Sequence, residues 1–390
     1  MKYPNVVKIL TLGLISITLV LGIYENVHAV FLSSLFGPKT RKIEKAKSIE
    51  TVVNRTKSNP VTYDFMEAKI NNKSIPLHLV TIDLNRVEIT PEIVLASERF
   101  GKIRKLSTIC KNKGAIAAIN GAFFSVKSRH PVGYLILDGK PIKAPLAFKE
   151  RTTFGIMNDN SIRIGKPKFR RRIRPQNEYF SVIDDINKTC GNFEIVLYNR
   201  EFGKTADVPE GGKAFLISTD NIIKKIVTEG KIEIPETGNV LIAGKLYVKN
   251  FEKTEIGNTI ELTQTLMYPW ENIRSGFGSV VGLVENGDIS FDSVKEKVSS
   301  GIKGRAARSA VGITVDNKLL LLATDAKSRS FRGITLNEQA EIMQAIGADS
   351  AVSLDGGSST TMYYNGRIVN TLHKGRERPV ATALIITPVK

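Results

Sequence analysis

The sequence predicts an α+β protein: a β-rich single domain with a mixed sheet and a few packed helices. From about residue 60 onward, short apolar runs of β type recur with turn signals between them. Only two segments have the apolar spacing of helices, and no repeat of fixed period or long low-complexity tract divides the chain. At 390 residues and 42% hydrophobic content, the chain can bury a large core.

The N-terminus has the composition of an export signal. Lys2 and Lys8 flank the start of an apolar run over residues 9–23, and Val27-His28-Ala29 resembles a small-x-small cleavage site. We expect a signal peptide over residues 1–29; the alternative is an uncleaved anchor, for which the run is short beside a hydrocarbon core about 30 Å thick. Residues 30–59 are polar and basic and read as a linker before a domain over residues 60–390. The protein is then secreted, periplasmic or envelope-associated.

Net charge limits the classes of partner, and cysteine content limits the kinds of covalent bridge and metal site. The net charge is +18, from 56 basic and 38 acidic residues. On an exported protein this favours anionic envelope polymers, phospholipid headgroups or phosphorylated substrates over nucleic acid, with membrane anchoring only through an uncleaved N-terminal segment. The densest basic run, KPKFRRRIR at residues 166–174, reads as a solvated loop or edge strand. Two cysteines, Cys110 and Cys190, exclude a disulfide framework and a thiolate metal site but leave one bridge open.

Five dipeptides mark tight turns between the β-type runs. Asn, Asp and Gly tolerate the left-handed backbone conformation that two-residue hairpin turns need, so these pairs predict antiparallel hairpins. The pairs are Asn71-Asn72, Asp138-Gly139, Asn286-Gly287, Asp316-Asn317 and Asn365-Gly366.

Two segments share the order helix, glycine stop, short buried strand and polar loop. Residues 102–112 have helical spacing, stop at Gly114, and lead through AIAAI to a loop that starts at Asn120. Residues 335–346 stop at Gly347 and lead through ADSAVSL to a loop at Asp355. If the two strands lie side by side, Asn120 and Asp355 emerge at the same edge of one sheet. Open α/β sheets bind ligands outside such carboxyl ends.

The loop SLDGGSSTTMYYNG at residues 353–366 is the most informative stretch of the chain. Asp355 stands where a strand ends, and Gly356 and Gly357 let the backbone turn or approach a ligand closely. Consecutive N–H groups and the hydroxyls that follow can surround an oxygen anion. The alternative is a plain hairpin turn in which the aspartate only caps the backbone.

Eight segments in one order resemble the phosphodiester glycosidase family. The resemblance covers roughly residues 75–388 and implies the fold of that family and hydrolysis of a sugar-1-phosphodiester, with an α-N-acetylglucosamine-1-phospho linkage as the expected bond. The segments are INGAFF (119–124), PVG with an Asp-Gly hairpin (131–139), LYNREFGKT (197–205), IPETGNVLIAG (234–244), RSAVGIT (308–314), ITLNEQAEIM (334–343), SLDGGSSTTM (353–362) and RPVATALII (378–386).

The resemblance gives the three leading candidates their roles. Asp355 is the expected catalytic carboxylate, acting as a base or stabilising positive charge at the anomeric carbon. Arg308 opens a strand and can bind phosphate oxygens bidentately, in a way that lysine cannot match. Asn120 offers an amide to a sugar hydroxyl or a phosphate oxygen. The leaving phosphomonoester reduces the need for a strong general acid.

Two further carboxylates are candidates for catalysis. Asp325 closes the run LLLLATD at another strand end and can supply a second carboxylate. Glu338 is also a candidate, but Thr335 and Glu338 have capping-box spacing, in which the glutamate returns to the backbone and does no chemistry. No cofactor is expected, although a divalent cation beside Asp355 stays open.

The remaining candidates are expected to bind substrate. Phe123 and Phe124 are expected to anchor their loop in the core, and His130 and His373 lie in loops beside the motifs, where a lone histidine usually neither binds phosphate nor moves a proton. The expected substrate-binding residues are Gly121, Gly356, Gly357, Ser358, Ser359, Thr360, His130 and Arg378.

Two other functions compete with hydrolysis. Ser300-Gly-Ile-Lys303 matches the Ser-x-x-Lys of serine acyl-enzymes acting on cell wall, but its partner motifs are absent. Ala122 and Ser358 replace family glycines, and Lys245 lies in IAGKL, the counterpart of a Ser-Gly-His-Gly-like segment. These departures motivate the second alternative, a catalytically inactive module that binds anionic envelope glycopolymer.

Overall fold

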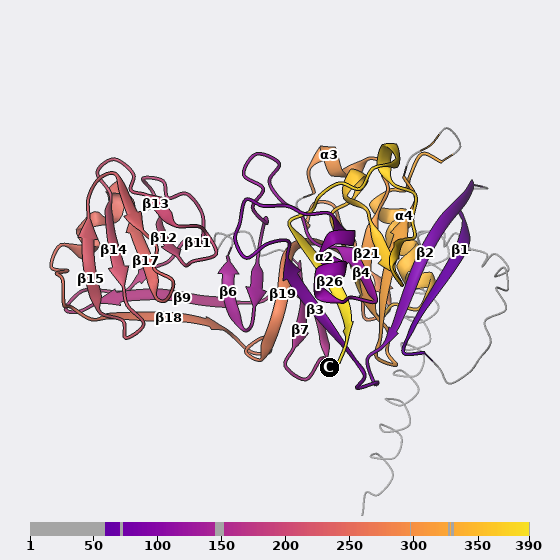
Figure 1. Ribbon diagram of the computed structural model, residues 1–390, viewed down its shortest axis with the longest axis horizontal. Coiled ribbons are helices and arrows are strands. Elements are labelled where there is room, and N and C mark those ends of the chain that lie inside the picture. The colour runs from indigo at the N-terminus through magenta and orange to yellow at the C-terminus, as the bar shows by residue number, and fades with distance from the viewer. Residues whose placement is uncertain are drawn as a thin grey trace, which may run out of the picture. The chain divides into compact units, whose positions relative to one another are not determined.

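The computed structural model describes residues 59–70, 73–144, 152–296, 298–326, 328 and 331–389 (Figure 1). These residues all belong to one compact unit, residues 43–390. The predicted signal peptide, and all of the predicted linker except residue 59, lie outside the described residues. Within the described ranges, no helix is long and apolar enough to cross a membrane.

The largest element of the fold is an antiparallel sheet of eleven strands. Its order is β1 (Val61–Ile70), β2 (Lys73–Asp83), β22 (Lys318–Thr324), β21 (Ser309–Ile313), β23 (Ser350–Ser353), β19 (Ile273–Glu285), β5 (Leu135–Leu137) and β6 (Lys140–Lys143). β7 (Thr152–Met157) and β20 (Asp288–Ile289) also pair with β19, and β8 (Ile162–Gly165) pairs with β7.

A second antiparallel sheet has five strands and faces the first across the main core. Its order is β25 (Arg367–Ile368), β24 (Met362–Tyr364), β4 (Ala117–Asn120), β26 (Thr382–Pro388) and β3 (Ile89–Leu95). Leu321 and Val352 of the large sheet pack in one buried cluster with Ile119 and Leu384 of the small sheet. The two sheets therefore form a sandwich.

A helix covers the outer face of each sheet. Because side chains alternate along a strand, Leu322 points away from Leu321 and packs with Ala340 and Met343 of α4 (Leu336–Ala345). On the small sheet, Ala118 and Ile385 pack with α2 (Leu106–Lys113) in the same way. The domain thus has four layers in the order helix, large sheet, small sheet, helix, which agrees with the predicted α+β class.

The segment between β8 and β19 forms smaller sheets. β9 (Phe169–Pro175) lies between β10 (Ser181–Val182) and β18 (Ile260–Leu266), and β9 and β18 run alongside each other in Figure 1. A five-stranded sheet follows with the order β11 (Asp185–Ile186), β12 (Ile195–Tyr198), β17 (Asn239–Ala243), β14 (Lys213–Ile217) and β15 (Ile223–Val227), and β13 (Thr205–Asp207) pairs with β16 (Lys231–Glu233). The basic run is therefore a central strand, and its reading as a loop or edge strand was wrong.

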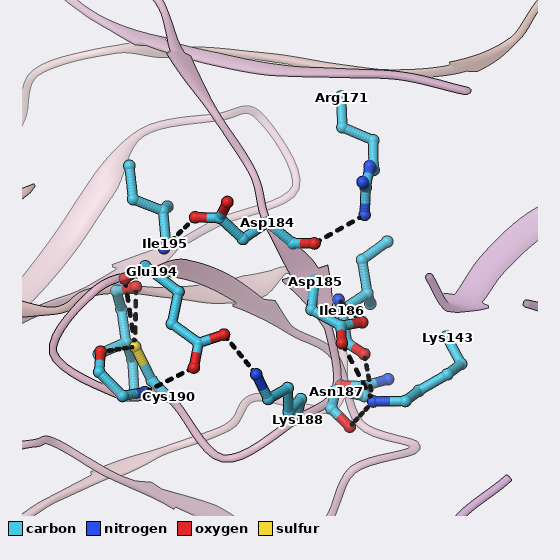
Figure 2. Close-up of polar contacts among 12 residues, drawn as sticks. Lys143, Arg171, Asp184, Asp185, Ile186, Asn187, Lys188, Cys190, Glu194 and Ile195 are labelled. Atoms are coloured by element: carbon cyan, nitrogen blue, oxygen red, sulfur yellow. Dashed lines mark hydrogen bonds and ion pairs between the residues drawn. The ribbon is translucent and has the colours of Figure 1, made fainter. Parts of the chain in front are cut away.

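A buried polar network joins β6 to β11 (Figure 2). Lys143 Nζ lies 3.6 Å from Asp185 Oδ2 and donates to the carbonyl of Asn187 at 3.2 Å. Burial lowers the pKa of Lys143 and raises that of Asp185, and each charge offsets part of the shift of the other. Nearby, Lys188 pairs with Glu194 at 2.5 Å. The network fixes the start of the smaller sheets to the end of the large one.

The two cysteines are buried and unpaired in the structure. Cys190 lies in the network of Figure 2, and Cys110 lies in α2. Burial raises the pKa of each thiol to about 12, so neither is a ready nucleophile at neutral pH. The bridge that the sequence left open is not formed here.

Most local predictions are confirmed, and one arrangement is not. Four of the five turn pairs lie in hairpins, and Asn71-Asn72 lies outside the described residues. Three of the four have positive φ at both residues, for example Asn365 at 43° and Gly366 at 89°, and Asp316-Asn317 has it at Asn317 alone. The helix predicted from residue 102 begins only at Leu106, because the backbone of Arg104 pairs with Val380. The strands predicted to lie side by side, β4 and β23, belong to two different sheets.

Candidate functional site

Asn120 joins the two sheets where the candidate loops meet. The side chain is fully buried, and its Nδ2 donates to the carbonyl oxygen of Asp355 at 2.7 Å. Its Oδ1 accepts from Ser309 Oγ at 2.7 Å and from the backbone N–H of Thr361 at 3.1 Å. Asn120 and the backbone of Asp355 thus meet across the sandwich, and not at the edge of one sheet as the sequence predicted. The amide is occupied within the protein and positions the loop.

Asp355 follows β23 and is only partly exposed at the mouth of this loop. Burial raises the pKa of its carboxyl group, while a hydrogen bond from Ser359 and the positive charge of Arg378 offset part of the rise. A partly desolvated carboxylate with a raised pKa, held by one hydroxyl and one cation, is suited to accept a proton or to stabilise positive charge.

Arg378 is near enough to this carboxylate for its charge to lower the pKa, and it is held from two sides. Its Nη1 donates to Ser359 Oγ at 3.0 Å and to Ser358 Oγ at 3.2 Å. Its guanidinium lies 5.0 Å from the centre of the Phe124 ring, a cation–π geometry. Arg378 therefore donates to Ser359, and both side chains lower the pKa of Asp355 against the effect of burial.

Arg308 lies behind the same loop and is 3% exposed. Its Nη2 donates to the carbonyls of Ile302 and Gly304 at 2.7 and 2.6 Å, and its Nε donates to Ile334 at 3.3 Å. Burial lowers its pKa to about 10, and it forms no ion pair with any described carboxylate. Because Nε and Nη2 donate to carbonyls, Nη1 is the nitrogen available to a ligand. Bidentate binding of phosphate would require some of these bonds to carbonyls to break.

Close packing explains two of the glycines in the loops. A Cβ on Gly356 would lie 2.9 Å from the carbonyl oxygen of Ala307 and 3.7 Å from Arg308 Nη1, and one on Gly121 would overlap Thr382. Gly357 has φ of +64° and donates its N–H to Ala307 at 2.7 Å. The backbone of Gly356 therefore packs closely against Ala307 and the buried guanidinium of Arg308.

The hydroxyls of the loop divide into two groups. Ser358 and Ser359 both face Arg378. Thr360 is buried, and its Oγ1 has no hydrogen-bond partner among the described residues. Its carbonyl accepts from Asn370 at 3.2 Å, so its backbone belongs to the scaffold under the loop.

Asp325 lies in a separate polar chain. Its Oδ1 is 2.9 Å from His78 Nε2 and accepts from the backbone N–H of Thr371 at 2.6 Å, and His78 Nδ1 is 2.9 Å from the hydroxyl of Tyr63. Burial alone would raise the pKa of Asp325, but the hydrogen bonds from His78 and Thr371 outweigh it, and the pKa is lowered. Sequence reasoning missed this chain, because single polar residues in β1 and β2 carry no distinctive spacing.

Glu338 caps α4. Its Oε2 accepts from the backbone N–H of Thr335 at 2.8 Å, Thr335 Oγ1 accepts from the Glu338 N–H at 3.2 Å, and its other oxygen pairs with Arg305. Both carboxylate oxygens are thus used inside the protein. Glu338 therefore has the capping role that its spacing from Thr335 allowed, and within the described residues its hydrogen bonds and ion pair do not include Asp355.

We expect Glu338→Ala to lower the free energy of unfolding by about 1 kcal/mol, the usual value of a lost cap, and to leave kcat within a fewfold of wild type. Urea unfolding and turnover of a sugar-1-phosphodiester measure the two effects. Thr335→Ala removes the other half of the same cap and is the matched control. A hundredfold loss of turnover in Glu338→Ala alone would instead make Glu338 a catalytic carboxylate.

The two loop histidines lie apart from this chain of contacts. His130 packs against the rings of Phe100 and Phe202, with centroids 5.2 and 5.7 Å away, and burial followed by the charge of Lys143 lowers its pKa. His373 is exposed in a short 3-10 turn. Among the described residues, neither histidine forms a hydrogen bond or ring contact with Asp355, Ser359 or Arg378.

No described group of three or more His, Cys, Asp or Glu side chains gathers as metal ligands would. Arg378 beside Asp355 also disfavours a divalent cation on the same oxygens. Ser300 of the alternative serine hypothesis begins α3 (Ser300–Lys303), and its side chain lies outside the described residues. The carbonyls of Ile302, in this helix, and of Gly304, just after it, accept hydrogen bonds from Arg308. A cleft of about 880 Å³ lies along β3, but none of the predicted site residues lines it.

Part of the chain matches a known protein family. The family model for phosphodiester glycosidase matches residues 195–387. This region, just under half of the chain, therefore resembles the phosphodiester glycosidase family. Arg308, Asp355 and Arg378 lie inside the phosphodiester glycosidase match, whereas Asn120 lies outside it and joins the site only through the fold.

The chain is also similar, at low sequence identity, to one curated protein and to two solved structures. A mouse protein named N-acetylglucosamine-1-phosphodiester alpha-N-acetylglucosaminidase is 25% identical over 180 residues, which are 42% of this chain and 32% of the mouse protein. The chain therefore spans about a third of that relative's length. Two crystal structures share the fold. A hypothetical protein from Synechocystis has a TM-score of 0.77 at 19% identity, and the match covers 90% of this chain and 64% of that one. A protein from Burkholderia pseudomallei has a TM-score of 0.67 at 17% identity, and the match covers 81% of this chain and 74% of that one.

Proposed function

We propose that this protein is an exported hydrolase that cleaves a sugar-1-phosphodiester to free sugar and phosphomonoester, with α-linked N-acetylglucosamine as the sugar. The family of residues 195–387 supports hydrolysis of a glycosyl phosphodiester, and the name of the mouse relative supports the choice of sugar. The basic, apolar N-terminus supports export. The observation that carries the proposal is the cluster in which Arg378 donates to Ser358 and Ser359 on the loop that begins at Asp355.

The phosphate binds Arg378 in this proposal. Ser358 and Ser359 occupy Nη1, and the Phe124 ring supports the guanidinium plane, so Nη2 and Nε remain as donors held at a fixed angle. Charge-assisted hydrogen bonds from arginine to phosphate are among the strongest in proteins. Arg308 adds a buried positive charge behind Gly356, and desolvation strengthens its attraction for a phosphate anion.

Asp355 acts at the sugar. In its ionised form it stabilises the positive charge that develops at the anomeric carbon, or it takes a proton from the attacking water. The raised pKa makes the carboxylate a stronger base than that of an ordinary aspartate. The phosphomonoester departs without a strong general acid, so one carboxylate and a cationic clamp suffice.

The test is release of free N-acetylglucosamine from a simple N-acetylglucosamine-1-phosphodiester by the full chain, beside Asp355→Asn. Release by the wild type that the variant lacks would establish the reaction class. If the wild type releases no sugar from a panel of sugar-1-phosphodiesters yet binds anionic glycopolymer saturably, the protein is a binding module and the proposal fails.

A further inference from the structure

The outer face of the sheet β10-β9-β18 carries a row of arginines. Along β9 the residues alternate, so Phe169, Arg171 and Ile173 turn inward while Arg170, Arg172 and Arg174 are exposed. Side chains two residues apart on one strand are separated by about 6.7 Å. Lys168 is also exposed and continues the same alternation in the sequence. The result is a straight line of cations on one strand.

The neighbouring strands leave this charge largely uncompensated. On β18 the cross-strand partners of Arg170, Arg172 and Arg174 are Thr265, Thr263 and Glu261. Glu261 pairs with Arg174 at 2.6 Å. Among the described residues, neither Arg170 nor Arg172 forms an ion pair. Threonine hydroxyls beside them add hydrogen-bonding capacity without cancelling the charge.

Apolar side chains border the row on its other side. Val182 of β10 pairs with Arg172 and is 55% exposed, and Phe180 is 46% exposed with the Arg174 guanidinium 4.7 Å from its ring centre. Tyr179, next in sequence, is 92% exposed. A sheet that buries one face on the core has no structural need for a solvent face of this composition.

We propose that Arg170 and Arg172 form a docking track for a linear, phosphodiester-linked envelope glycopolymer, separate from the candidate site at Asp355. A single row of evenly spaced guanidinium groups matches an extended chain with one negative charge per repeat better than it matches the plane of a membrane. Arginine also binds phosphate oxygens bidentately. The identity of the polymer as phosphodiester-linked rests on the proposed function; the track itself rests on the arrangement of β9.

The test compares two double variants of the full chain. Arg170→Gln/Arg172→Gln removes two charges from the track, and Lys224→Gln/Lys225→Gln removes two exposed charges from β15 as the matched control. Fluorescence anisotropy with labelled poly(glycerol phosphate), titrated at several salt concentrations, gives Kd and its salt dependence. We expect the track variant to bind at least tenfold more weakly, with a slope of log K against log salt reduced by about 1.4, while the control changes little.

Equal loss of affinity in both double variants would show that binding follows net charge and would overturn the track. The track would also be overturned if the Arg170→Gln/Arg172→Gln variant lost binding to phosphatidylglycerol vesicles but kept its affinity for the polymer. The face would then bind a membrane. Hydrolysis of a small sugar-1-phosphodiester is measured in parallel. If the track variant binds polymer more weakly but the wild type hydrolyses nothing, this inference stands and the proposed function fails. If the wild type hydrolyses the small substrate but the track variant binds polymer as tightly as wild type, the proposed function stands and this inference fails.

Discussion

Asp355→Asn is expected to reduce turnover roughly 10²- to 10⁴-fold, the usual range for loss of a positioned acid–base group, in a protein that stays folded. The amide keeps the shape of the side chain but neither stabilises positive charge nor takes a proton. Steady-state kinetics on a sugar-1-phosphodiester measure the loss. Turnover within a fewfold of wild type would remove Asp355 from the catalytic machinery.

The same variant is expected to be more stable than the wild type at neutral pH. The pKa of Asp355 is raised in the folded state, so its contribution to stability is full below the unfolded pKa and is lost as pH rises through the folded pKa. At neutral pH, above the unfolded pKa, the carboxyl group therefore destabilises the folded state, and asparagine removes this cost. Thermal unfolding should show the gain at pH 7 and little of it near the ordinary aspartate pKa of about 3.9.

Ser359→Ala is the matched variant for this argument. It keeps the carboxylate but removes the hydrogen bond that lowers its pKa. The acid limb of the pH–rate profile, where activity falls as Asp355 takes up a proton, should therefore move to higher pH. An unmoved acid limb would mean that another group controls it.

Arg378→Ala is expected to lower kcat/KM by about a hundredfold or more, because hydrogen bonds to charged groups contribute about 1.5–3 kcal/mol each. Arg378→Lys keeps the charge but loses the fork and should recover only part of the activity. Arg376→Ala removes an exposed arginine two residues away and is the control. If Arg378→Lys equals the wild type, the guanidinium geometry has no role in phosphate binding.

The local elements of this fold could be predicted from sequence because their signals are local. The Asn365-Gly366 turn and the Thr335 cap of α4 each depend on a few adjacent residues, and both are found. The placement of β4 and β23 in different sheets depends on antiparallel pairing between distant segments, and neither strand carries a sequence signal for its partner.

The candidate site shows the same limit. The glycine-rich loop identified Asp355, and the ordered motifs pointed to Arg308 and Arg378. The sequence did not reveal that three carbonyls accept hydrogen bonds from Arg308. Every residue has a backbone carbonyl, so no residue type marks these partners. Nor did it reveal that Phe124, expected only to anchor its loop, supports the guanidinium of Arg378.

The amide of Asn120 makes assembly of the site all-or-none. It holds the end of β4, the start of β21 at Ser309, and the backbone on either side of the glycine-rich loop. A fragment limited to residues 195–387 has no β4 and cannot supply this amide, even though it contains Asp355 and both arginines. Partial unfolding that parts the two sheets would likewise remove the geometry around Asp355 at once, so enzymatic activity would serve as a direct reporter of docking between the sheets.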